Sequence, residues 1–206
     1  MCSSDLIMRS NVCKIENGTK DLAAILKESE KVAIYNELTH KQTLQLRLIC
    51  EEIDGMLPNI IDDFSGELWI DFEDGVCKVN VSLCFDEFTA AKKQDLVDIA
   101  TNKKNAAARG IVGKIRSSIE NVLLDKEAAQ GFEIAPSACH YASEYYGYMD
   151  YSGLWTLEHY RKTVSIEEQS EDWDELEKSV IASVADDIIV GVKGKRADII
   201  VVKKFA

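Results

Sequence analysis

Apolar residues recur at helical spacing between residues 44 and 61, and this stripe is the longest in the chain. Steps of three and four place its members on one face of a helix that packs against a core. Thr39 and Gln42 have the form of a capping box, which predicts that the helix begins just after Thr39. Pro58 lacks a backbone donor, so it should kink or loosen the last turn. The stripe consists of Leu46, Ile49, Cys50, Ile53, Met56 or Leu57, and Ile60.

Two runs that alternate between apolar and polar residues follow, at residues 67–73 and 76–85. Asp74 and Gly75 separate them, and an Asp-Gly pair between alternating runs is a strong signal for a tight antiparallel hairpin. Residues 188–205 contain a second pair of apolar runs joined by a short basic turn, which predicts a terminal hairpin. The alternation indicates an antiparallel sheet with one face against helices.

The remaining segments complete one domain that spans residues 1–206. In the first predicted helix the inward set includes Ile34, and in the last it includes Val180. Together the elements predict an α/β (α+β) two-layer sandwich, in which helices cover one face of a mainly antiparallel, mixed sheet. The further elements are a short edge strand or a loose segment at 6–15, helices at 21–35, 106–123 and 173–184, a strand at 154–164, and an insertion or long loop at 125–153.

Composition narrows the class of function. The chain has 206 residues, of which 46% are hydrophobic, and this is enough for a sizeable core. The formal net charge of −12 argues against a nucleic-acid-binding surface, which needs a basic face. The sequence shows neither an apolar run of membrane-spanning length nor a signal-peptide core, so we expect a cytoplasmic protein without membrane contact.

Cysteine and histidine residues show no metal-ligand spacing. The six cysteines form no CxxC pair, and we interpret them as reduced, mostly buried thiols. The three histidines lie far apart in the sequence, so the residues predict no metal site.

The order of these elements resembles that of the histidine-kinase-like (GHKL or Bergerat-fold) ATPases. Residues 46–57, LRLICEEIDGML, look like the ATP-site helix of that family. Residues 184–205 look like the end of the anti-sigma-factor serine kinases, where an acidic pair leads into a terminal hairpin. The resemblance implies the histidine-kinase-like ATPase fold, with ATP and Mg²⁺ as the cofactors of an intact site.

The resemblance assigns the tandem acids to the ATP site. In the family this helix carries a Glu that acts as a general base or orients water, and four residues later an Asn that holds Mg²⁺. Glu51 or Glu52 matches the acid. Gly55 or Met56 stands where the Asn should be, and neither residue can ligate a metal ion.

Two further family motifs are also met only in part. An Asp at the end of the hairpin's second strand binds the adenine amino group in the family, and Asp86 takes that place here, but the glycines that should follow are absent. A glycine-rich turn then cradles phosphate at a helix N-terminus. The basic segment of residues 101–115 is our candidate for that turn. Its candidate phosphate-binding residues are Lys103, Lys104, Asn105, Arg109, Gly110, Gly113 and Lys114.

Each of these features has a structural alternative. Tandem acids such as Glu51 and Glu52 are typical of a solvated helix flank, and the basic segment is equally typical of an exposed loop. Seven aromatic residues between Tyr141 and Tyr160 either form a partner-binding surface or pack the insertion onto the sheet.

The partly met motifs favour a cytosolic regulatory protein that binds a protein partner and has a degenerate ATP site. The alternatives are an active ATP-dependent serine kinase or ATPase, and an interaction module that binds no nucleotide. The cofactor is either ATP with Mg²⁺ or none. The expected partner is a protein, and a nucleotide and a second copy of the chain are further candidates.

Overall fold

The computed structural model of the protein describes residues 7–17, 22–61, 63–84, 110–124, 153–164, 179–193 and 195–205. These residues form an α+β arrangement in which seven strands build one sheet. Every strand pairing among them is antiparallel. The helices are α1 (Leu22–Tyr35), α2 (His40–Ile60), α4 (Gly110–Leu124), α6 (Leu157–Val164) and α8 (Val180–Val184). The strands are β1 (Met8–Arg9), β2 (Cys13–Glu16), β3 (Ser65–Glu73), β4 (Val76–Cys84), β5 (Gly153–Thr156), β6 (Asp187–Lys193) and β7 (Arg196–Lys204).

The sheet has the strand order β1-β3-β4-β7-β6-β5. Strand β2 pairs with the same edge of β3 as β1 does, further along that edge. Both predicted hairpins are confirmed. Asp74 and Gly75 form the β3–β4 turn with φ angles of 48° and 78°, as a type I′ turn requires. The last strand β7 lies between β4 and β6, so the two hairpins join along their full lengths into one sheet.

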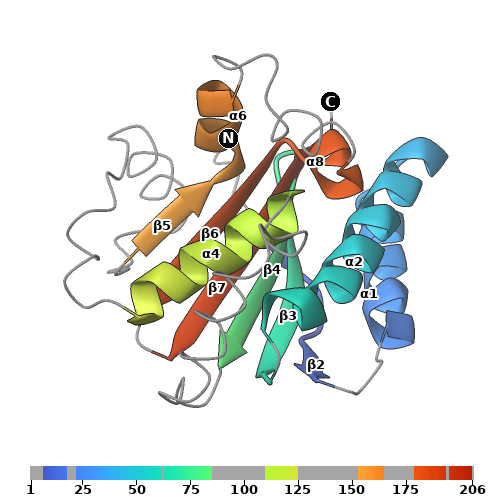
Figure 1. The fold of residues 1–206 in the computed structure, drawn as a ribbon. Helices are drawn as coiled ribbons and strands as arrows, with labels where there is room; N and C mark the ends of the chain where they lie inside the picture. The colour runs from blue at the N-terminus through green and yellow to red at the C-terminus, as the bar shows by residue number, and fades with distance from the viewer. Residues whose placement is uncertain are drawn as a thin grey trace.

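Helices α1, α2, α4 and α8 lie over one face of this sheet, as the amphipathic stripes predicted (Figure 1). The capping box at the start of α2 is confirmed, because Thr39 and Gln42 bond each other's backbone N–H groups. Pro58 lies inside the last turn of α2, and the helix still continues to Ile60. None of the described helices combines the length and the apolarity needed to cross a bilayer.

The opposite face of the sheet is also apolar over β5, β6 and β7. A second buried cluster lies there, separate from the core under the helices. Burial of most residues in β6 and β7, on both faces of the sheet, explains why their sequences lack the alternation of β3 and β4. The cluster consists of Leu154, Ile189, Ile200 and Val202, with Val76 packed against it.

The edge strands β1 and β2 are separated by a bulge. Arg9 pairs with Asp71 and Cys13 with Leu68, so three residues oppose two on β3. Ser10 stabilises the bulge because its hydroxyl accepts a hydrogen bond of 2.9 Å from the backbone N–H of Ile70. A bulge at a sheet edge hinders pairing with another strand, so we do not expect this edge to associate with other chains.

Three details of the predicted elements are wrong. The segment predicted as one strand at 154–164 is a short strand, β5, followed by helix α6. Ile34 was expected to face inward, but it is 78% exposed, and Val32 is buried in its place. Val180 is likewise exposed, because α8 begins only at that residue, directly after its N-cap Ser179.

The C-terminus of α1 is closed by a Schellman motif that uses a residue other than glycine. The backbone N–H of Leu38 bonds the carbonyl of Ala33 at 2.9 Å, and that of Glu37 bonds the carbonyl of Ile34 at 3.2 Å. Glu37 adopts a φ of 53°, in the left-handed region that glycine occupies without strain.

Replacing Glu37 by glycine should therefore stabilise the fold. We expect the Glu37→Gly variant to raise the free energy of unfolding by about 0.5 kcal/mol, because relief of strain exceeds the gain in unfolded-chain entropy. Urea denaturation of the dilute protein measures this difference. Asn36→Gly is the control, because Asn36 precedes the strained position, and its substitution should not stabilise. A loss of stability in Glu37→Gly would contradict the assigned strain.

Candidate functional site

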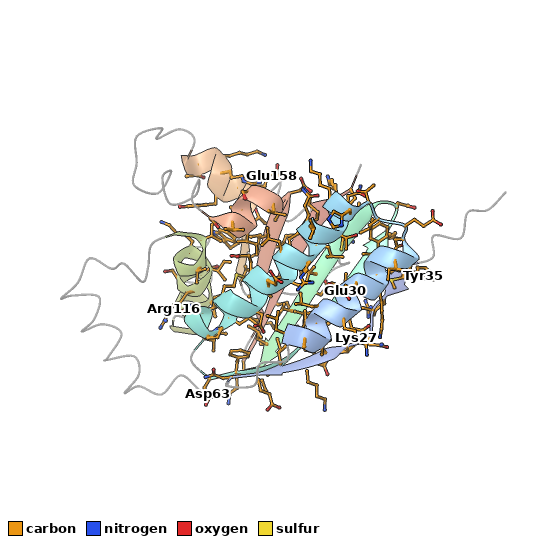
Figure 2. All side chains as sticks on the ribbon, turned by 90° about the vertical axis from the view of Figure 1, so that its right-hand side faces the viewer. Lys27, Glu30, Tyr35, Asp63, Arg116 and Glu158 are labelled. Carbon is orange, nitrogen blue, oxygen red and sulfur yellow. The ribbon has the colours of Figure 1, made fainter. Side chains whose placement is uncertain are left out.

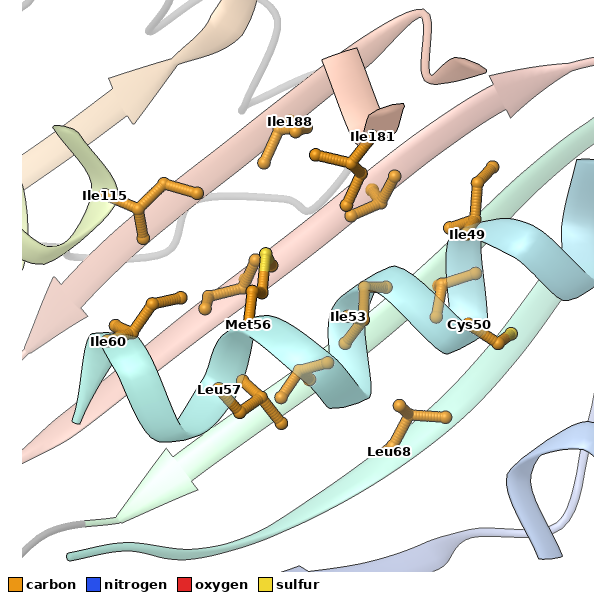
Figure 3. Close-up of a cluster of buried hydrophobic side chains, with 14 of the residues drawn as sticks. Ile49, Cys50, Ile53, Met56, Leu57, Ile60, Leu68, Ile115, Ile181 and Ile188 are labelled. Carbon is orange, nitrogen blue, oxygen red and sulfur yellow. The ribbon is translucent and has the colours of Figure 1, made fainter. Parts of the chain in front are cut away.

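The site predicted from the sequence centres on α2, whose apolar stripe packs against the sheet (Figure 3). Helical geometry separates the two acids that follow Cys50, because consecutive residues point about 100° apart around the axis. Glu51 lies on the same side as Arg47, and Glu52 on the same side as Met56 and Asn59. The two carboxylates therefore face different neighbours.

Glu51 takes part in ion pairs along the flank of α2 that faces α1. Its Oε1 accepts a hydrogen bond of 3.0 Å from Nε of Arg47, and Nη1 of Arg47 lies 3.5 Å from Oε1 of Glu30 on α1. These side chains remain substantially exposed, so each pair contributes little to stability. Glu51 is thus paired with Arg47 of its own helix, and Arg47 makes the contact with α1.

Glu52 points to the other flank of α2, which packs against α4 and α8. One turn beyond Met56 on this flank, the backbone carbonyl of Asn59 accepts a hydrogen bond of 3.4 Å from Nη1 of Arg116 on α4. Glu52 is half-buried there. Of the two predicted acids, only Glu52 is on the side of α2 that faces the candidate phosphate-binding helix.

Helix α4 carries the described part of the candidate phosphate-binding segment. The helix begins at Gly110, and Gly113 is buried in its first turn. The ammonium group of Lys114 lies 5.5 Å from the ring centroid of Tyr160 on α6, a cation–π distance. Lys114 is thus directed towards α6. Asp86, Lys103, Lys104, Asn105 and Arg109 lie outside the described residues.

The position four residues after Glu52 is part of the core. Met56 is only 5% exposed and belongs to the main apolar cluster under the helices. Figure 3 shows it among buried isoleucines from α2, α4, α8 and β6. A thioether is not a ligand for Mg²⁺, which prefers oxygen. Gly55, four residues after Glu51, is exposed and has no side chain to offer.

The aromatic stretch is described only at its end. The rings of Trp155 and Tyr160 lie 5.9 Å apart, and both pack against the main core. These two side chains, on β5 and α6, thus contribute to the packing of the core. Tyr141 to Tyr151 lie outside the described residues.

Two fixed carboxylates were not predicted from the sequence. Asp71 accepts hydrogen bonds from Arg9, Trp69 and Asn80 on the sheet face opposite α2, at 2.7 to 3.1 Å. Sequence reasoning missed this cluster because Arg9 is 62 residues away from Asp71 in the chain. Asp71 therefore fastens the first strand to the sheet.

Asp187, the second of these carboxylates, lies at the N-terminus of α6. Its Oδ1 accepts hydrogen bonds of 2.9 Å from the backbone N–H groups of Glu158 and Ile188. Burial raises the pKa of Asp187, while these two hydrogen bonds oppose the rise. Arg161 of α6 donates to the backbone carbonyls of Ala182, Ala185 and Asp186, so α6 and the end of α8 are held together.

The cysteines of the described residues are free, and three of the four are buried. For these four of the six cysteines the prediction of mostly buried thiols is confirmed, with Cys84 as the exposed exception. Burial raises the pKa of Cys50 to about 12, so its thiol stays protonated and is a poor nucleophile or metal ligand. Across the described ranges, no group of His, Cys, Asp and Glu side chains is arranged to hold a metal ion.

Comparison with known protein families, with characterised proteins and with solved structures finds no match to this chain.

Proposed function

We propose that this chain is a regulatory protein that acts by binding a protein partner, and that its histidine-kinase-like ATP site is degenerate. The observation that carries the proposal is Met56. It occupies the metal-ligand position of the resembled motif, and its side chain is buried among isoleucines rather than directed at a ligand.

The chemistry of Mg²⁺ supports this proposal. The ion needs oxygen ligands in near-octahedral geometry, and it bridges the phosphates of ATP. An Asn in place of Met56 would bring a polar amide into a packed apolar cluster, which is costly unless hydrogen bonds satisfy it. If Glu51 is counted as the acid instead, it is paired with Arg47, and Gly55 four residues later has no side chain. Neither choice of acid therefore comes with a metal ligand four residues later.

Calorimetric titration tests the proposal. We expect ATP and ADP, each with and without Mg²⁺, to give no magnesium-dependent binding in the micromolar range, because the bridging ligand is missing. A thermal shift measured with the same ligands should be equally small. Micromolar binding that requires Mg²⁺ would overturn the claim of degeneracy.

The position of Glu52 favours a second candidate, an active ATP-dependent kinase or ATPase. Glu52 is on the flank of α2 that packs against α4, and Gly110, Gly113 and Lys114 form the first turn of α4. If the chain hydrolyses ATP or transfers phosphate, Glu52→Ala should abolish that activity. Glu51→Ala is the matched control, because Glu51 faces α1 and should leave the activity unchanged.

A further inference from the structure

The corner where α1 meets α2 exposes apolar side chains that the core does not use. Among the described residues six large hydrophobic side chains are exposed, and three of them are here: Ile34 at 78%, Tyr35 at 66% and Leu44 at 51%. Scattered exposed hydrophobics are normal, but a local group indicates a binding surface.

Ile34 and Leu44 lie at the same level of the antiparallel pair α1–α2. The contact between Glu30 and Arg47 fixes the register of the two helices. Ile34 lies four residues after Glu30, and Leu44 lies three residues before Arg47. Both are therefore about one turn closer to the connection between the two helices. Figure 2 shows this side of the molecule, with Lys27, Glu30 and Tyr35 along α1.

Steps of three or four residues along each helix, taken between exposed or partly exposed positions, define four rows across the outer surface of the helix pair. Each row joins one residue near or in α1 with one in α2, and each of these residues is at least partly exposed. Three rows combine opposite charges and the fourth combines two apolar side chains. The rows are Glu37 with Lys41, Ile34 with Leu44, Glu30 with Arg47, and Lys27 with Glu51.

We infer that this four-row surface is a homodimer interface. A two-fold axis parallel to the helices places α1 of one copy on α2 of the other at the same level. Ile34 then meets Leu44 of the second copy, and every charged row meets its opposite charge. The two helix pairs form an antiparallel four-helix layer between the two sheets.

Charge singles out a second copy as the occupant. The chain carries a net charge of −12, so two copies repel each other over most of their surfaces. The six charged residues of the four rows sum to zero, and each finds its opposite at the same level. A strongly acidic partner would instead face three carboxylates here, and a strongly basic partner three cations.

The dimer should be weak and concentration-dependent. Only one row is apolar, and exposed ion pairs contribute little each. Sedimentation velocity of the full chain over a dilution series should show a reversible monomer–dimer equilibrium. Ile34→Glu should weaken association by about tenfold or more, because it buries a carboxylate against Leu44 of the second copy. Ile7→Glu, at another exposed isoleucine, is the matched control and should leave association unchanged.

A charge exchange tests the register. Lys27→Glu and Glu51→Lys should each weaken association, because each places like charges in one row on both sides of the axis. A mixture of the two variants should form heterodimers, since every row then joins opposite charges again. The double variant should also dimerise.

A wild-type chain that stays monomeric throughout the series would overturn the inference. So would a dimer that Ile34→Glu and Lys27→Glu leave intact, or a mixture of charge variants that forms no heterodimer. None of these results depends on nucleotide, so they are distinct from a failure of the proposed function.

Discussion

The Leu46→Ala variant should lose about 2 to 5 kcal/mol of unfolding free energy, the largest effect that we predict. Leu46 is the first buried residue of the α2 stripe; it is completely buried and belongs to the main core cluster. Truncation removes apolar contacts and leaves a cavity that neighbouring isoleucines fill only partly. Urea denaturation followed by circular dichroism measures the change, which should lower the midpoint and leave the slope intact.

Leu44→Ala is the matched control for this change. Leu44 is on the same helix two residues earlier, and it is 51% exposed. Its truncation should change the unfolding free energy by about 0.5 kcal/mol or less, since it opens no cavity. The comparison requires protein dilute enough to be monomeric, because Leu44 also belongs to the proposed dimer surface. Equal losses in the two variants would contradict the assigned orientation of α2.

The main elements of the fold could be predicted because local patterns specify them. The α2 stripe, its Thr39 capping box and the Asp74-Gly75 turn each express a rule that acts within a few residues. The pairing of β7 with β4 could not be predicted, because it joins segments more than a hundred residues apart. No local pattern carries that information.

Two errors have identifiable causes in single residues. In α1 the buried face includes the polar residues Glu28 and Ser29, so the apolar pattern alone pointed to Ile34 instead of Val32. Hydrogen bonds from Lys31 and the backbone of Asn11 satisfy the Glu28 carboxylate and, against the effect of burial, lower its pKa.

At the start of α6, the hydroxyl of Thr156 accepts a hydrogen bond from the backbone N–H of His159, three residues later. This is an N-cap, and it was available in the sequence as a signal for a helix.

The candidate site could be predicted only as a pair of adjacent acids. Helical spacing alone indicates that Glu51 and Glu52 point in different directions. It does not indicate which helix lies on the side of each acid. That distinction depends on the contacts of Arg47 with Glu30 and of Arg116 with Asn59, both between different helices.

The Asp71→Ala variant should lose roughly 2 to 4 kcal/mol, the second large effect that we predict. The carboxylate of Asp71 accepts two hydrogen bonds from Arg9 and one each from Trp69 and Asn80, and its side chain is only 14% exposed. Asn80 is almost completely buried, so removal of the carboxylate takes a partner from an amide that water hardly reaches.

Control substitutions and the place where hydrogen exchange rises distinguish the local hydrogen-bonding role of Asp71 from a general effect of removing a negative charge. Glu67 is an exposed carboxylate on the same strand and the same face as Asp71, so Glu67→Ala should stay within about 0.5 kcal/mol of the wild type. Amide hydrogen exchange should rise in β1, which Arg9 fastens to β3, before it rises in β4.

Because the guanidinium of Arg9 is mostly exposed, Arg9→Ala should cost only about 1 kcal/mol. If Arg9→Ala costs as much as Asp71→Ala, the ion pair rather than the buried amide dominates the cluster.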